Sequence, residues 1–506
     1  MQLCVGVFVA TLALLLAATS TADAASPSLR HQARTVNATV LNACKSLTAN
    51  SSSATETNYF GSSAFLDNSL RYMSSTVQTP ACVYVPTTPE DLSKAIKIIG
   101  SQRLSFAVSS GKHASNKGFS STTGIQISMK GFQHVNLSAD KSYVDIGSGN
   151  IWDNVYAALQ GTGVNIVGGR VTGVGVGGFI SGGGGFSWKT NQYGLTIDTL
   201  LQADMVMPDG SLKSVTEQSD PDLFWALKGG GNRFGIVYNW RLKTNPQTDL
   251  VYGGLRTYTF DQIDSVVKAV SNFAVNNKDP KAQVLPTFNF VLGQPGVSLL
   301  AFYDGPSAPA GVFDGFDTSK GGPKPFTDAW KAQSFGDLVR ATPSNATQYT
   351  RGQFMSVTFQ NFSQSIIEQC VNQTKVIGAQ SFLHGGSFVS YDVEPFLMTY
   401  SDNTNKGGAW PHSNSPLPLN IYFAWNGELN DDFWNEQIRE TAKLLRAQAV
   451  AEGQNLDGLY LYPNYAVVDT PASELYGSEN AARLQTLRQR YDPQDVMGLT
   501  TFFSFV

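Results

Sequence analysis

The sequence predicts an α+β protein with at least two domains, on three observations. The chain has 506 residues, more than one ordinary hydrophobic core accommodates. Its composition is that of a globular protein, with 42% hydrophobic and 15% charged residues. Up to about residue 244, short strand and helix patterns alternate and are joined by glycine-rich loops, whereas the later part carries longer strand patterns without βαβ spacing.

The N-terminus has the pattern of an export signal. Residues 5–17 form an apolar run of about a dozen residues, and a small-x-small motif follows at residues 22–24. A membrane span needs roughly 20 apolar residues, so this run is too short to be one. We expect a signal peptide over residues 1–24, a secreted protein and no membrane segment after cleavage. A buried N-terminal helix is the alternative.

Cysteines and glycosylation sequons agree with export. Once Cys4 leaves with the signal, Cys44, Cys82 and Cys370 remain, and an odd count in an oxidising compartment implies one bridge and one free thiol. We predict a Cys44–Cys82 disulfide that ties the N-terminal segment to the first domain, with Cys370 buried. The Asn-x-Ser/Thr sequons begin at Asn37, Asn50, Asn136, Asn345, Asn361 and Asn372.

Charge and motif content argue against two classes of ligand. The net charge of -4 leaves no basic footprint for nucleic acid. The chain has no Cys-x-x-Cys motif, and its five histidines are scattered, so we expect no metal site.

Local signals place the elements of the first part. Residues 25–77 are rich in Ser, Thr and Asn and are interpreted as a loosely ordered lead-in. Thr88 and Asp91 form a capping box around Pro89, which opens a helix with an apolar face. Strands are predicted at residues 83–85, 106–108, 125–127, 143–146 and 203–207, with helices from about residues 151 and 222.

The later part predicts an antiparallel sheet with covering helices. Strand patterns occur at residues 288–292, 298–303, 354–359 and 417–426. In the last, alternation sends Leu419, Ile421, Phe423 and Trp425 to one face and Asn420, Tyr422 and Asn426 to the other, where these polar residues could line a pocket or face solvent. A helix opening at Asp431 carries Trp434, Ile438 and Leu445 on its apolar side.

Glycines crowd residues 161–185. Gly173, Gly175 and Gly178 satisfy G-x-G-x-x-G, but that dinucleotide fingerprint must open a helix, and four successive glycines at 182–185 do not make the first turns of one. We therefore reject a Rossmann fold. Glycine at this density lets backbone approach a large planar ligand closely, although tight turns in a glycine-rich structural protein remain the alternative.

Several ordered blocks then resemble the berberine-bridge-enzyme-like branch of the vanillyl-alcohol-oxidase and p-cresol-methylhydroxylase superfamily. They are S-S-G-K-H-A-S-N-K-G-F-S at residues 109–120, G-G-R-V-T-G-V-G-V-G-G-F-I-S-G-G-G at 168–184, Y-G-L-T-I-D at 193–198, D-L-F-W-A-L at 222–227 and Y-P-N-Y at 462–465. Tyr476-Gly, Arg483-Leu and Tyr491-Asp-Pro match the family's closing segment. The resemblance covers roughly residues 78–247 and 456–506.

The resemblance implies a two-subdomain FAD-binding domain (residues 78–247), an inserted antiparallel-sheet substrate domain (248–455) and a C-terminal segment that completes the FAD site (456–506). It implies that His113 bonds the flavin 8α-methyl group and that Asn464 helps to hold the flavin. The residues implied around pyrophosphate and ring are Ser110, Gly111, Gly175, Gly177, Gly178, Gly182, Gly183, Ser187 and Ile236.

The chain departs from the family pattern at three positions. Val171 stands where some members attach flavin a second time through Cys, so attachment would rest on His113 alone. Ser109 replaces a common Arg, and Lys112 replaces a usual Gly, which puts a side chain where the loop normally has none. Without the resemblance, a histidine in such a loop is more often simply solvated.

The implied activity is a secreted, monomeric oxidase that transfers a hydride from a small organic substrate to flavin and passes the electrons to oxygen. Tyr462 is the candidate base, and a structural ring-stacking role is its alternative; a phenol needs a nearby cation or donor to act near neutral pH. Alcohols, sugars and secondary metabolites are open as substrates. A degenerate, allergen-like binding protein is the competing hypothesis, and absence of flavin absorbance would support it.

Overall fold

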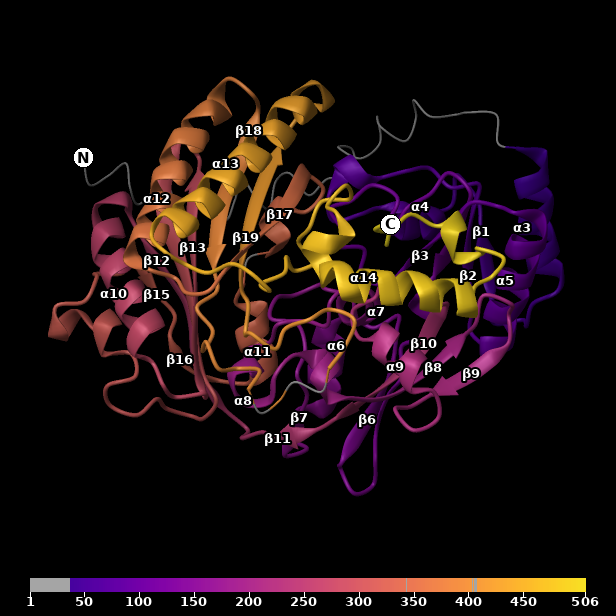
Figure 1. The fold of residues 1–506 in the computed structure, drawn as a ribbon, viewed down its shortest axis with the longest axis horizontal. Coiled ribbons are helices and arrows are strands. Elements are labelled where there is room, and N and C mark those ends of the chain that lie inside the picture. The colour runs from indigo at the N-terminus through magenta and orange to yellow at the C-terminus, as the bar shows by residue number, and fades with distance from the viewer. Residues whose placement is uncertain (1–36, 343, 403, 405–406) are drawn as a thin grey trace.

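Three large β-sheets carry the fold of the computed structural model, which describes residues 37–506 except 343, 403, 405 and 406. The first two sheets and their helices lie on one side of the molecule and the third lies on the other (Figure 1). The chain's C-terminal segment runs between the two sides, so residues distant in sequence meet at the centre.

The first sheet has four strands, in the order β1-β2-β4-β3. β2 and β3 run parallel to β4, and β1 is antiparallel to β2. Helix α5 (Pro89–Gln102) begins after Thr88, whose side chain accepts a hydrogen bond from the Asp91 amide, as the capping box predicts. The strands are β1 (Glu56–Asn58), β2 (Cys82–Val85), β3 (Phe106–Ser109) and β4 (Ile125–Ser128), which confirms the predicted ones.

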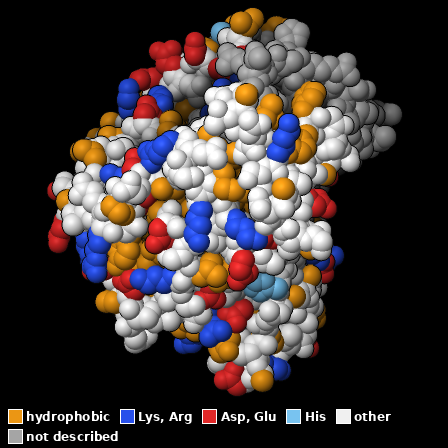
Figure 2. Space-filling view, turned by 90° about the vertical axis from the view of Figure 1, so that its right-hand side faces the viewer, with side chains coloured by type: hydrophobic (Ala, Val, Ile, Leu, Met, Phe, Trp, Pro, Cys, Tyr) orange, Lys and Arg blue, Asp and Glu red, His pale blue; other side chains and the backbone are white. Residues whose placement is uncertain are grey.

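The second sheet has five antiparallel strands, in the order β5-β6-β10-β8-β9. Its strands are β5 (Val135–Leu137), β6 (Tyr143–Gly147), β8 (Leu200–Val206), β9 (Leu212–Val215) and β10 (Ile236–Lys243). The associated helices are α6 (Trp152–Leu159), α7 (Val176–Ser181), α8 (Thr190–Tyr193) and α9 (Pro221–Leu227). On the face shown in Figure 2, basic and acidic side chains are interspersed.

The glycine-rich segment differs in one respect from the sequence expectation. Gly175 is the N-cap of α7, so G-x-G-x-x-G does open a helix, although one of only six residues. The four glycines that we judged unable to start a helix lie after it and end it at Gly182. The Rossmann fold is still absent here, because the adjoining sheet is antiparallel rather than parallel.

The third sheet is antiparallel and has the order β15-β12-β14-β13-β18-β19-β17, with β16 also paired to β12. Three helices, α10 (Ile263–Asn276), α12 (Gln364–Gly378) and α13 (Asp431–Ala451), lie on its outer face (Figure 1). The predicted sheet with covering helices is confirmed, as is burial of Trp434, Ile438 and Leu445. The strands are β12 (Val251–Tyr258), β13 (Ala282–Val291), β14 (Gln294–Tyr303), β15 (Thr327–Asp328), β16 (Lys331–Gln333), β17 (Arg351–Phe359), β18 (Gly386–Val393) and β19 (Leu417–Trp425).

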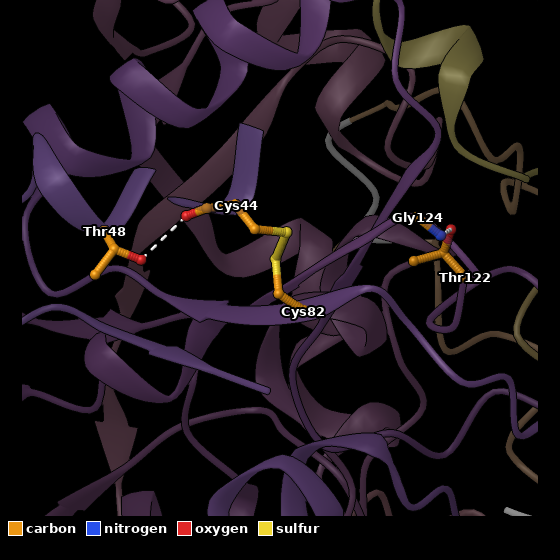
Figure 3. The surroundings of a disulfide bond; sticks show 5 residues. All are labelled: Cys44, Thr48, Cys82, Thr122 and Gly124. Atoms are coloured by element: carbon orange, nitrogen blue, oxygen red, sulfur yellow. Dashed lines mark hydrogen bonds between the residues drawn. A yellow bond between two sulfur atoms is a disulfide. The ribbon is translucent and has the colours of Figure 1, made fainter. Parts of the chain in front are cut away.

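The lead-in is ordered, which corrects the expectation for residues 37–77. Helix α3 (Ala38–Ala49) is capped by Asn37 and buries Ala43 and Leu47, and α4 (Ser63–Ser69) follows β1. The predicted disulfide joins Cys44 in α3 to Cys82 at the start of β2 (Figure 3). Composition alone missed this order because the disulfide and the helix packing act between distant segments. The expected signal peptide, residues 1–24, lies outside the described residues.

The C-terminal segment completes the first half of the molecule. Helix α14 (Ala472–Tyr491) packs on α9 (Figure 1) and is broken at Gly477, where φ is +72°. The Arg233 guanidinium donates to the carbonyls of Phe502 and Phe503, 3.0 and 3.3 Å away. The last residues are therefore part of the core and not a free tail.

Other predicted features have clear locations. Cys370 is buried as a free thiol. Asn37, Asn50, Asn136 and Asn372 are exposed, Asn361 is half-buried, and Asn345 lies in a short 3-10 helix (Ser344–Thr347). Within residues 37–506, apart from the four excluded positions, no helix has the length and apolar character to cross a bilayer and no cluster of His, Cys, Asp or Glu could hold a metal.

Candidate active site

A cavity of about 690 Å³ lies between the two halves of the molecule. Its walls come from the loop after β3, the glycine-rich segment around α7, the inner face of the third sheet and the C-terminal segment. Most of the residues that the sequence nominated meet here, although they come from distant parts of the chain. Those in the wall are Ser110, Gly111, His113, Gly175, Gly177, Gly178, Gly182, Ile236, Tyr462 and Asn464.

Two nominated residues lie behind this wall. Gly183 packs against the Tyr462 ring and Pro463, 3.0 Å from each if a Cβ is built on it. Ser187 is fully buried, and its hydroxyl accepts the amides of Gly168 and Lys189. The chain turns inward after Gly182, so these two residues support the wall without forming it.

The glycines of the wall fall into two kinds. Gly111 and Gly175 are in mutual contact, because a Cβ on either would come within 2.1 Å of the other's amide nitrogen. Gly178 is the opposite case: it is exposed in the cavity, and a Cβ there would meet nothing within 4 Å. Gly178 therefore leaves space beside exposed backbone, as expected of a cradle for a large ligand.

His113 lines the cavity and is half-buried. Burial lowers the pKa of His113 to about 4, although the negative charge of Asp153 opposes this. The imidazole stacks on Tyr72, with ring centroids 4.2 Å apart and planes 18° apart. It is therefore neutral near pH 7 and has a nitrogen lone pair free for chemistry.

The backbone at Lys112 has a conformation that favours glycine, the residue that the resemblance implies at this position. Its φ is +63°, in the left-handed region that glycine adopts without strain. The side chain turns away toward the lead-in, where its ammonium donates to the Asp67 carbonyl. The loop thus keeps the glycine-type backbone conformation in spite of the substitution.

Tyr462 and Asn464 form a hydrogen-bonded pair in the wall. The Asn464 amide nitrogen donates to the Tyr462 hydroxyl at 2.9 Å and to the Phe179 carbonyl at 3.0 Å. Burial raises the pKa of Tyr462 above its ordinary value, while the Asn464 donor and the positive charge of Arg170 act in the opposite direction. These are the donor and the cation that the sequence could not identify.

Sequence reasoning missed a buried ion pair beside Tyr462. Arg170 in the glycine-rich segment lies 2.6 Å from the Glu394 carboxylate, and both side chains are almost fully buried. The Tyr465 hydroxyl donates to Glu394 at 3.0 Å, and burial raises the pKa of Glu394. No local signal announced this pair, because Glu394 follows the end of β18 at Val393 and lies far from Arg170 in the sequence.

Asp392 is a second carboxyl in the wall. Burial and the nearby charge of Glu394 raise the pKa of Asp392 to about 6, and the Asn420 amide donates to it at 3.1 Å. Asn420 and Tyr422 line the cavity, which confirms part of the sequence hypothesis for that strand face, whereas Asn426 is exposed outside it. The strands of the third sheet contribute both apolar and polar side chains to the rest of this end: Leu255, Leu285, Val291, Leu300, Phe354 and Phe388, and Thr287, Asn289, Ser298, Ser387 and Ser390.

Known flavin-dependent proteins resemble this chain in sequence. Residues 80–216 match the family model of the FAD binding domain. The chain is an FAD-linked oxidoreductase. The oxidoreductase is 29% identical over 431 residues to the FAD-dependent monooxygenase macF of Penicillium terrestre, across 82% of this chain and 80% of the relative.

Solved structures confirm the predicted fold class. Wild-type BBE-like 1 from Physcomitrella patens matches the oxidoreductase with a TM-score of 0.74 at 19% identity, over 92% of this chain and 98% of that one. Glucooligosaccharide oxidase from Acremonium strictum matches with a TM-score of 0.72 at 21% identity, over 92% and 98%. The oxidoreductase therefore has the α+β fold of berberine-bridge-enzyme-like FAD enzymes, as the sequence blocks indicated.

The cavity of the oxidoreductase fits an FAD. Its volume lies in the range of cofactor pockets, about 300–1,000 Å³. Gly178 leaves open space beside the backbone, Val171 rather than Cys lies in the wall, and His113 offers a neutral nitrogen. These residues fit a flavin that has one point of attachment.

Proposed function

We propose that the oxidoreductase removes a hydride from a small hydroxylated organic molecule, using an FAD attached through His113, and passes the electrons to molecular oxygen. The observation that carries this is the placement of neutral His113, open Gly178 and the Tyr462–Asn464 pair in one cavity wall. FAD, when bound, supplies the hydride acceptor. The chain supplies attachment, orientation and control of the substrate proton.

The substrate hydroxyl must lose a proton as the hydride leaves. Tyr462 keeps its own proton at neutral pH, because burial raises its pKa, so its role is to hold the substrate oxygen by a hydrogen bond. Asp392, with a pKa of about 6, is ionised near neutral pH and suits the role of proton acceptor. The Arg170–Glu394 pair fixes the wall between them.

Tyr462→Phe tests the first of these roles. We expect flavin reduction at saturating substrate to slow by roughly 10²–10³-fold, the usual cost of removing one hydrogen-bond donor that stabilises charge on the reacting oxygen. FAD content and the unfolding midpoint should not change, because Asn464 still bonds Phe179. Stopped-flow absorbance measures the rate, and a wild-type rate in the variant would remove Tyr462 from the mechanism.

The lining favours an aromatic or polycyclic hydroxylated substrate over an oligosaccharide. The cavity lining as a whole exposes more apolar than polar surface, and Phe354 and Phe388 present rings from the third sheet beside polar side chains such as Ser390 and Asn420. A sugar would leave many hydroxyls facing these groups without partners. A panel of phenols, polyketide-like alcohols and oligosaccharides, assayed for peroxide release, tests this order. Faster turnover of oligosaccharides would overturn it.

His113→Ala tests covalent attachment. Acid denaturation should leave flavin colour with the wild-type chain and release all of it from the variant, because His113 is the one histidine among the described residues that line the cavity. The visible spectra of precipitate and supernatant give the result directly. His384→Ala, at a histidine stacked on Phe433 outside the cavity, is the matched control and should retain its flavin. Acid-stable flavin in His113→Ala would contradict the assignment.

Two further outcomes would distinguish an oxidase from a monooxygenase and from a binding protein. If the product carries ¹⁸O from ¹⁸O₂, the protein inserts oxygen, which is the activity in the name of its relative macF. If the purified protein has no flavin absorbance and binds no added FAD, the binding-protein hypothesis holds instead. Peroxide formed in equal amount to oxidised product supports the oxidase.

We also propose that the protein is secreted and monomeric. The Cys44–Cys82 disulfide and the exposed sequons at Asn37, Asn50, Asn136 and Asn372 support export. N-terminal sequencing of protein from the culture medium tests cleavage after residue 24, and a mobility shift with endoglycosidase tests glycosylation. Light scattering of the deglycosylated secreted protein somewhat below the 54.5 kDa of the full chain would support a monomer, and twice that mass would contradict it.

A further inference from the structure

Tyr72 belongs to the lead-in, outside the blocks that resemble the family, yet it is only 7% exposed and lies in the cavity wall. It stacks on the His113 imidazole at a centroid distance of 4.2 Å and an angle of 18°. A residue far from the attachment loop in sequence therefore covers one face of the imidazole.

Tyr72 is fixed from both sides of the cavity. Its amide donates to the Lys112 carbonyl at 3.1 Å, and its carbonyl accepts the Tyr349 amide at 2.8 Å. Its hydroxyl lies 2.7 Å from the Ser344 carbonyl and 2.9 Å from the Thr347 hydroxyl. The ring thus joins the attachment loop to the segment that precedes β17, and it has little freedom to rotate.

The edge of the imidazole is fixed by a second contact. A Cβ built on Gly173 would lie 3.1 Å from Nε2 of His113, so the edge abuts this glycine, whose φ is +83°. Gly173 is held in turn by Asp153, which accepts its amide at 2.8 Å and the Thr172 hydroxyl at 2.6 Å. Because Tyr72 covers one face of the imidazole and Gly173 contacts one edge, the ring is held in one orientation.

We propose that Tyr72 is the positioning residue for covalent flavin attachment: its ring holds the imidazole of His113 in the attacking orientation. This rests on the proposed function. Attachment breaks one C–H bond of the flavin 8α-methyl group and the imidazole N–H bond, and forms one C–N bond. Two electrons and two protons remain on the isoalloxazine, and molecular oxygen takes them to give hydrogen peroxide. Orientation of this kind raises the rate because the reacting atoms are already close and aligned.

Two substitutions separate the ring from its hydroxyl. Tyr72→Leu removes the stacked ring, and Tyr72→Phe keeps it but loses the bonds to Ser344 and Thr347. Each protein is purified, incubated with added FAD, and sampled over time for flavin fluorescence on a denaturing gel. Total FAD after acid release is measured alongside, because a role limited to the fold would lower FAD binding and attachment together.

We expect Tyr72→Leu to bind FAD yet attach it at least tenfold more slowly than wild type, and Tyr72→Phe to fall between them. Tyr193→Phe, outside the cavity wall, is the control and should attach at the wild-type rate. If Tyr72→Leu does not fold, Tyr72→Met, which also lacks the ring, takes its place. Attachment at the wild-type rate in a folded variant without the ring overturns this proposal alone. Absence of acid-stable flavin in the wild type overturns it together with attachment through His113.

Discussion

Burial changes the protonation of several side chains in the cavity wall, and each change suits a different task. The pKa of His113 falls to about 4, which keeps the imidazole neutral. The pKa of Asp392 rises to about 6, into the range where a carboxylate can exchange protons near neutral pH. The two pKa values shift in opposite directions because burial disfavours the charged form of each group. Histidine is charged when it carries the proton, and aspartate is charged when it has lost it.

Asp392 links stability to pH with a defined sign. Its pKa is higher in the folded chain than in the unfolded one, so its contribution is complete below about pH 4 and is lost as pH rises through about 6. Asp392→Asn cannot ionise, so it does not lose stability through this group as the pH rises. We expect the free energy of unfolding of the variant, relative to that of wild type, to increase by about 1–3 kcal/mol from pH 4 to pH 7.5. Denaturant unfolding at both pH values measures the difference, with the exposed Asp457→Asn as control.

The prediction for Asp392 has a second, kinetic readout. In the wild type, the rate of flavin reduction plotted against pH should change near pH 6. This change should be absent in Asp392→Asn and present in Asp457→Asn. A stability difference that does not change with pH would contradict the raised pKa. If the rate of flavin reduction in Asp392→Asn still changes near pH 6, another group accepts the proton.

At the scale of elements, the short helix α7 leaves space for a ligand because one of its residues has no side chain. It is six residues long and begins at Gly175, and Gly178 inside it faces open space. Glycine within a helix costs roughly 0.5–1 kcal/mol relative to alanine. Glycine here is therefore better explained by the cavity than by the helix.

Gly178→Leu tests that explanation. Its φ is not in the left-handed region and a Cβ meets nothing within 4 Å, so the fold should tolerate the change. The longer side chain would occupy cavity space, and we expect FAD binding to weaken by at least tenfold with no loss in unfolding midpoint. Gly315→Leu is the control, because its added Cβ would meet nothing closer than 3.8 Å and it lies outside the cavity wall. Unchanged FAD affinity in Gly178→Leu would contradict the cradle.

The elements also show what the sequence could and could not predict. Thr88 and Asp431 start helices through local chemistry, and both predictions are confirmed. The lead-in was predicted wrongly although its disulfide was predicted, because composition does not show that Ala43 and Leu47 of α3 are buried in the core of the first sheet. Arg170 and Glu394 are 224 positions apart, and no local pattern announces that they pair. Tyr72 was missed for the same reason, since its stacking on His113 exists only after folding.

For the whole molecule, the cavity depends on contacts that join its two halves. Lys189, beside the second sheet, forms a buried ion pair of 3.0 Å with Asp304, after β14. Arg170 and Glu394 form another across the same boundary. Breaking a buried pair by removing one partner is costly because the other charge stays uncompensated. The relative position of the halves, and so the shape of the cavity, is fixed by charge as well as by apolar packing.

The position of the chain's last residues has a consequence for synthesis in the cell. Phe502 lies in the cavity wall and packs on Phe119, with ring centroids 5.0 Å apart. While the ribosome still holds the end of a nascent polypeptide, this side of the cofactor chamber is missing. Flavin loading must therefore wait until Phe502 has left the ribosome, although most of the binding loops belong to the first half of the sequence.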